Sequence, residues 1–108
     1  MLSKLIRLYL DARNVDRALV VLEDLIHNEP DSIPLRARGA QLYLNTGKRE
    51  KALEHLDVLG DLQLEAGQKD AAIKTVTAIL ALDPPNKAEY VNLYREMTGR
   101  EPPPARSG

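Results

Sequence analysis

Hydrophobic residues recur at intervals of three and four along most of the chain, which is the spacing of one face of an α-helix. The pattern is present in residues 2–12, where Tyr9 is its only aromatic member, and it continues in residues 16–27. The apolar face of this second segment comprises Ala18, Val21, Leu22, Leu25 and Ile26. No segment alternates between apolar and polar positions as a β-strand does, so the sequence predicts an all-α fold.

Glycine and proline residues divide this pattern into about six helices. The predicted helices span residues 2–12, 16–27, 33–45, 48–66, 69–82 and 87–98. Asp31 or Ser32 is expected to cap the third helix, and Gly47 and Gly67 to end the third and the fourth. We expect the fourth helix to continue through Gly60, because one glycine costs a helix only about 1 kcal/mol relative to alanine. A break there would give two short helices instead.

Four pairs of residues are separated by the same distance of 34 residues. These pairs are Tyr9 and Tyr43, Ala18 and Ala52, Leu22 and Leu56, and Leu25 and Leu59. A small alanine lets two helices approach closely, and a tyrosine near the end of the preceding helix fills the wedge between them. The sequence therefore predicts stacked units of two helices each.

These residues, in this order, resemble the tetratricopeptide repeat family. The resemblance covers residues 1–98 and implies an α-solenoid of antiparallel helix pairs. The three consecutive prolines at 102–104 predict an extended or disordered tail over residues 99–108. A third unit is shortened, because Ala72 follows Ala52 after 20 residues rather than 34. We therefore expect helix 48–66 to serve two consecutive units, and the last helix, with Tyr90 and Tyr94, to cap the array.

The resemblance also implies a binding surface for a peptide or a protein segment on the concave side, lined by the first helix of each unit. Transferred onto this sequence, the polar positions that would contact the partner are Arg7, Arg38, Gln41, Asn45, Asp57 and Asp61. The alternative is that arginines such as Arg7 and Arg38 only solvate a helix face, as most surface charges do.

Five acidic residues follow one another at spacings of three and four along helix 48–66. They are Glu50, Glu54, Asp57, Asp61 and Glu65. Like charges at this spacing destabilise an isolated helix by a few tenths of a kcal/mol per pair. The row is either a docking strip for lysine or arginine on a partner, or a solvated helix face partly neutralised by Arg38, Arg49 or Lys51.

Composition narrows the classes of function. A net charge of −1 argues against nucleic-acid binding, although RNA binding by a helical repeat is kept as a third and weaker hypothesis. Without cysteine the chain can form no disulfide, and without a long apolar run it has no membrane span. We expect a cytoplasmic location.

Residues with catalytic or metal-binding chemistry are few. No phosphate-binding loop, nucleophile elbow or zinc-binding helix motif is present. His27 and His55 are the only histidines, and we expect both on the surface. The sequence thus predicts no enzyme activity, metal, cofactor or small-molecule substrate.

The leading hypothesis is a non-catalytic module that binds another protein or a peptide. The rival hypothesis is a self-association module, a homodimer, in which apolar residues at the two ends of the array contact a second copy. Leu2 and Leu5 at one end, and Tyr90, Leu93 and Tyr94 at the other, motivate it.

Overall fold

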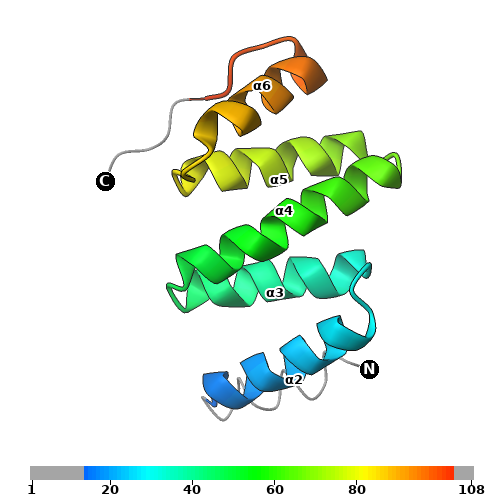
Figure 1. Cartoon of the computed structure of the whole chain (residues 1–108), viewed down its shortest axis with the longest axis vertical. Coiled ribbons are helices and arrows are strands. Elements are labelled where there is room, and N and C mark those ends of the chain that lie inside the picture. The colour runs from blue at the N-terminus through cyan, green and yellow to red at the C-terminus, as the bar shows by residue number, and fades with distance from the viewer. Residues whose placement is uncertain (1–13, 104–108) are drawn as a thin grey trace.

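The computed structural model describes residues 14–103, which contain five helices and no β-strand (Figure 1). The helices are α2 (Val15–Asn28), α3 (Ile33–Asn45), α4 (Arg49–Glu65), α5 (Lys69–Ala81) and α6 (Lys87–Thr98). Successive helices run in opposite directions and lie one above another in a single file, each packed against the next along the chain. The predicted all-α fold is confirmed, whereas the predicted helix 2–12 lies outside the described residues.

The ends of these helices follow from local chemistry. The side chain of Asn14 accepts a hydrogen bond from the N–H of Arg17 at 3.3 Å and caps α2. Of the two expected caps for α3, Ser32 takes the role, since its hydroxyl oxygen accepts from the N–H of Leu35 at 3.3 Å. Gly47 and Gly67 follow α3 and α4 with φ angles of +75° and +76°, a conformation that favours glycine.

Helix α4 is continuous through Gly60, as the sequence predicts. Gly60 is buried where α4 crosses α5, and a β-carbon at this position would lie 3.6 Å from Cγ2 of Thr75. This is an ordinary van der Waals distance, so the site has room for one methyl group. The glycine is therefore required neither by backbone conformation nor by close packing.

The turn between α3 and α4 recurs 20 residues later between α4 and α5. The N–H of Lys48 donates to the carbonyl of Tyr43 at 2.9 Å, and the N–H of Gln68 donates to that of Gln63 at 2.8 Å. Polar contacts within the two helix pairs repeat as well: the ring of Tyr43 stacks on His55 with centroids 5.4 Å apart, and the hydroxyl of Thr75 donates to Gln63 at 2.6 Å. Helix α4 is thus the second member of one helix pair and the first member of the next.

The core consists of two clusters on either side of α3 and α4. The first joins α2, α3 and the start of α4 and contains Ala18, Leu19, Leu22, Ile26, Leu35, Leu42, Tyr43 and Ala52. The second joins α3, α4 and α5 and contains Ala40, Leu56, Leu59 and Ile79. Tyr43 is 4 % exposed, which confirms its expected place between helices, and Tyr9 lies outside the described residues.

Helix α6 differs from the others because none of its residues is buried. Residues 99–103 after it form no helix or strand, and Glu101 receives two bonds from Arg95, at 2.8 Å from Nε and 2.8 Å from Nη2. The rest of the predicted tail lies outside the described residues.

Candidate functional site

The outer side of α4 is a ridge of carboxylates between two open pockets. All five acidic residues of the predicted row are exposed. At about 100° per residue, their side chains fall within about 80° around the helix axis. One pocket lies between this ridge and α2, and the other lies between the ridge and the turn that joins α5 to α6. Glu54 lines both pockets.

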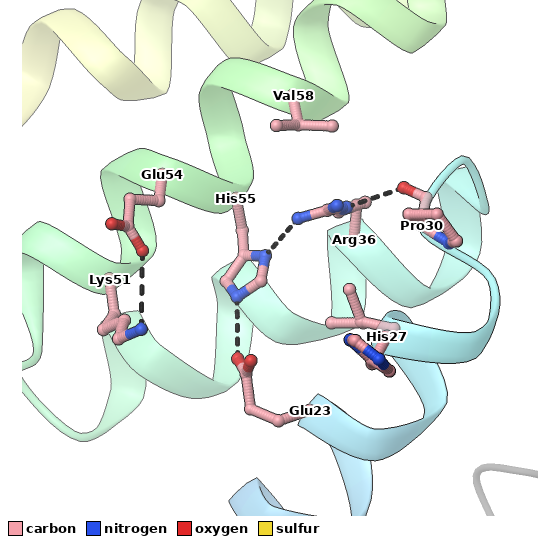
Figure 2. Close-up of a pocket in the computed structure, with 9 residues that line it drawn as sticks. Glu23, His27, Pro30, Arg36, Lys51, Glu54, His55 and Val58 are labelled. Atoms are coloured by element: carbon pink, nitrogen blue, oxygen red, sulfur yellow. Dashed lines mark hydrogen bonds and ion pairs between the residues drawn. The ribbon is translucent and has the colours of Figure 1, made fainter.

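The pocket between α2 and α4 has a volume of about 550 Å³ and a mixed, charged lining (Figure 2). Glu23 and His27 enter it from α2, Arg36 from α3, and Lys51 from α4. Acidic and basic side chains are balanced here, and Lys51 pairs with Glu54 at 3.5 Å. The pocket therefore carries no excess of either charge.

His55 is at the back of this pocket, and the expectation that it is a surface histidine is wrong. It is 4 % exposed, whereas His27 is exposed as expected. His55 lies on the side of α4 that turns toward α2 and α3, and a β-carbon at Gly39 would be in ordinary van der Waals contact with its ring, at 3.6 Å. The sequence identifies Tyr43, the stacking partner of His55, as a repeat position. The spacing of residues along the chain does not indicate that His55 faces this tyrosine.

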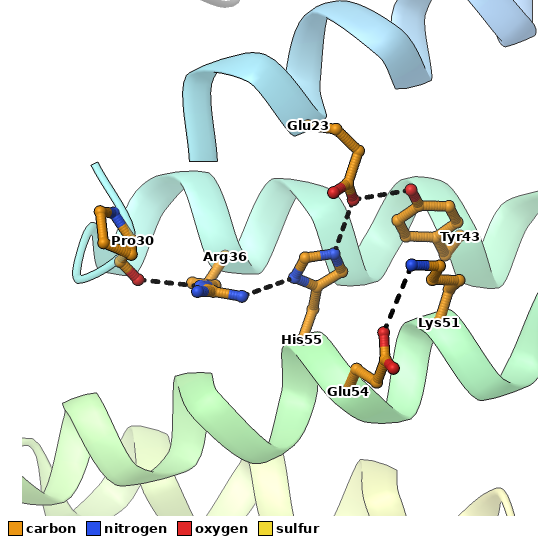
Figure 3. Close-up of polar contacts among 7 residues, drawn as sticks. All are labelled: Glu23, Pro30, Arg36, Tyr43, Lys51, Glu54 and His55. Carbon is orange, nitrogen blue, oxygen red and sulfur yellow. Dashed lines mark hydrogen bonds and ion pairs between the residues drawn. The ribbon is translucent and has the colours of Figure 1, made fainter. Parts of the chain in front are cut away.

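Four side chains from three helices form one hydrogen-bonded network around His55 (Figure 3). Oε1 of Glu23 accepts from the hydroxyl of Tyr43 at 2.7 Å and lies 2.9 Å from Nε2 of His55. Nη1 of Arg36 lies 3.1 Å from Nδ1 of His55. A guanidinium group has only hydrogen-bond donors, so Nδ1 of His55 must be the acceptor. The ring proton is therefore on Nε2, which donates a hydrogen bond to Oε1 of Glu23. The network therefore holds His55 as the neutral Nε2–H tautomer.

The network shifts the pKa values of two of its members, Glu23 and Tyr43. Burial raises the pKa of Glu23, but the hydrogen bonds from Tyr43 and His55 outweigh burial, and the net pKa lies below the ordinary value of 4.5. Burial and the hydrogen bond to Glu23 raise the pKa of Tyr43. Glu23 is therefore ionised and Tyr43 is neutral at physiological pH. The polar atoms of these four side chains are bonded to one another across α2, α3 and α4, so the network joins the three helices.

The second pocket, of about 630 Å³, has a different character. Four carboxylates line it, namely Glu50, Glu54, Asp57 and Asp83, against one guanidinium, that of Arg49. The remaining lining includes Leu53, two prolines and Tyr90, whose hydroxyl donates to Oδ1 of Asp57 at 2.7 Å. The second pocket is therefore a groove that combines several carboxylates with apolar side chains.

The structure places the predicted contact residues in two groups. Arg38, Gln41 and Asn45 are exposed on one side of α3, turned about 140° to 200° away from Arg36, which faces the pocket beside α2. Asp57 and Asp61 are exposed on the ridge of α4. Neither described pocket contains a residue from both groups, and Arg7 lies outside the described residues.

Between residues 14 and 103, no cluster of three or more His, Cys, Asp or Glu side chains has the geometry to hold a metal ion. Within that range, no helix combines the length and the apolar character needed to cross a bilayer.

Comparison with known families agrees with the repeat seen in the fold. Residues 9–61 match the family model described as a tetratricopeptide repeat. The chain contains a tetratricopeptide repeat region. No match to a curated protein was found. Within the region, the repeat positions Ala18, Leu22, Ala52 and Leu56 are all buried, so the residues that define the tetratricopeptide repeat are those that pack its helices.

Tetratricopeptide repeats generally mediate protein–protein interaction and are typically non-catalytic. The matched residues include α2, α3 and most of α4, and therefore both the buried network and the start of the acidic ridge. The last residues of α4, together with α5 and α6, lie beyond the match, and α4 packs against both α3 and α5.

Proposed function

We propose that this protein is a non-catalytic binding module that holds a segment of another protein. The observation that carries the proposal is that α3 and α4 use different residues for packing and for their exposed surface. Their repeat residues Tyr43, Ala52 and Leu56 are buried between helices, whereas the polar positions assigned to partner contact are exposed. These exposed residues are Arg38, Gln41, Asn45, Asp57 and Asp61.

The exposed groups are suited to recognising a polypeptide. Gln41 and Asn45 are joined by a hydrogen bond of 3.0 Å between Nε2 and Oδ1, which fixes the direction of both amides and leaves donors and acceptors for a peptide backbone. Arg38 adds a positive charge beside them. In this proposal, the concave side of the array carries the partner, with Arg7 extending the same surface.

A displayed peptide library, selected against the whole chain, tests the function. We expect peptides that bind with measurable heat in calorimetry and that lose affinity in the variants Arg38→Glu or Asp57→Lys/Asp61→Lys. Arg17→Glu on α2, also exposed, serves as the control and should leave binding unchanged. The proposal would be contradicted if no peptide in the library bound, or if none of the variants changed the affinity.

Self-association is the second candidate, and α6 motivates it. None of its residues is buried, and its apolar residues Val91, Leu93, Tyr94 and Met97 are all partly exposed. A second copy could cover this face. Molar mass from light scattering, measured over about a hundredfold range of protein concentration, distinguishes the two: a persistent dimer that Leu93→Glu dissociates supports self-association, and a monomer throughout excludes it.

A further inference from the structure

We propose that the groove between α4 and the α5–α6 turn binds an extended, basic segment of the partner, with a lysine or arginine at every second position. This inference rests on the proposed function and adds to it the surface and the chemistry of the partner. It concerns the groove lined by Glu50, Leu53, Asp57, Asp83, Pro84 and Tyr90.

The charge of the groove favours a cationic occupant. Its carboxylates are only partly neutralised by the protein itself: Glu54 lies 3.5 Å from Lys51, and Asp83 lies 3.7 Å from Lys87. Both are exposed pairs, which contribute little. Asp57 receives a hydrogen bond from Tyr90, a neutral group whose pKa burial and Asp57 raise to about 12. Glu50 has no ion pair within the described residues.

The groove also fits the hydrocarbon part of a basic side chain. Leu53 and Tyr90 are partly buried and Pro84 is buried, so the wall between the carboxylates is apolar. Lysine and arginine lay their methylene groups along such surfaces while their charged ends reach polar groups. A tyrosine ring adds a face to which a cation is attracted.

The protein already places one cation at this groove. Nη1 of Arg49, on the rim, donates to the main-chain carbonyl of Leu82 at 3.4 Å. This carbonyl is at the end of α5, where carbonyl groups lack partners within the helix. A guanidinium group therefore lines the same groove as the carboxylates, and a main-chain carbonyl accepts a hydrogen bond from it.

The spacing of the ridge determines the shape of the occupant. Its carboxylates are three or four residues apart on α4, which corresponds to about 4.5–6 Å along the helix axis. In an extended chain, side chains on the same side recur every second residue, at about 6.6 Å. A basic segment with alternating lysines can therefore place one cation beside each carboxylate in turn, and Asp61 and Glu65 continue the row beyond the groove.

Two synthetic nonapeptides of equal composition test this inference. One alternates alanine and lysine, and the other carries its four lysines in a central block. Binding to the whole chain is measured by fluorescence anisotropy at about 50 mM salt, where screening is moderate. We expect the alternating peptide to bind at least about threefold more tightly than the block peptide. Equal affinities of the two peptides would overturn the proposal that the groove prefers a lysine or arginine at every second position.

Matched variants locate the binding surface. Glu50→Gln/Asp57→Asn removes two charges from the groove, and Asp24→Asn/Glu29→Gln removes two exposed charges from α2 and the residue after it. We expect the groove variant to lose about five- to tenfold in affinity and the control less than twofold. Equal losses would show general attraction between charges and overturn the site.

Amide chemical shifts, recorded on the chain with each peptide, separate this inference from the proposed function. Shifts confined to α4 and the α5–α6 turn support the groove. Shifts confined to Arg38, Gln41 and Asn45 on α3 would overturn the groove and leave the proposed function in place. A selected library that yields no binder at all would overturn both.

Discussion

Glu23 links α2 to both helices of the α3–α4 pair through side-chain hydrogen bonds. Its Oε1 atom is within hydrogen-bonding distance of both Tyr43 and His55, from two different helices. Its side chain remains 41 % exposed, so solvent weakens each of these bonds. The network therefore specifies how α2 is oriented, while the apolar cluster of Ala18, Leu19 and Leu22 contributes most of the stability of this contact.

Tyr43→Phe tests the first bond of this network. The ring would keep its stacking on His55, and only the donor to Glu23 would be lost. Because Glu23 is charged but partly exposed, we expect the free energy of unfolding to fall by about 1 kcal/mol. Urea denaturation measures it. Tyr94→Phe is the control, since the Tyr94 hydroxyl makes no hydrogen bond among the described residues; an equal effect of both changes would contradict the assignment.

Glu23 also makes stability depend on pH. Its pKa in the folded protein lies below the ordinary value of 4.5, so its ionised form stabilises the fold above about pH 4.5. This contribution is lost as the pH falls through the folded-state pKa. We expect the stability of the wild type to fall more steeply between pH 5 and about 3 than that of Glu23→Gln. Parallel profiles in urea titrations would show that Glu23 does not contribute.

At the scale of the helix, the two buried glycines predict opposite results. Gly60→Ala places a methyl group at an ordinary distance from Thr75 and removes a residue that disfavours helix, so we expect stability to rise by about 0.5–1 kcal/mol. Gly39→Ala brings its methyl group to 3.1 Å from Cδ1 of Ile26, which is closer than an ordinary contact, so the Ile26 side chain would have to move. We expect it to be destabilising. Thermal unfolding measures both, and a loss of stability in Gly60→Ala would contradict this account.

Helix boundaries could be predicted from the sequence because they depend on neighbours along the chain. Ser32, Gly47 and Gly67 act within a few residues of their own positions, and the observed bounds of α3 and α6 are those expected. The contact of His55 with Glu23 joins residues 32 positions apart. Such a contact depends on how α2 lies against α4, which no periodicity within either helix contains. The same holds for the acidic groove, since Asp83 and Tyr90 reach it only through the α5–α6 turn.

At the scale of the molecule, stability is unequal along the file of helices. Helices α3, α4 and α5 contain buried residues and each packs against two neighbours, whereas α6 has no buried residue and contacts α5 and, through Tyr90, Asp57 of α4. We expect backbone amides of α6 to exchange with solvent at least about tenfold faster than those of α4. Hydrogen exchange followed by mass spectrometry measures this, and equal protection would indicate that a partner or a second copy covers α6.

Because α4 belongs to two helix pairs, packing limits which of its positions can change in sequence during evolution. Helix α4 packs against α3 on one side and α5 on the other, and six of its 17 residues are buried in these contacts. Mutations of α4 that leave folding intact are expected on its outer side, where five of the eight exposed residues are carboxylates. A new specificity on α4 would therefore arise mainly by exchange of these carboxylates.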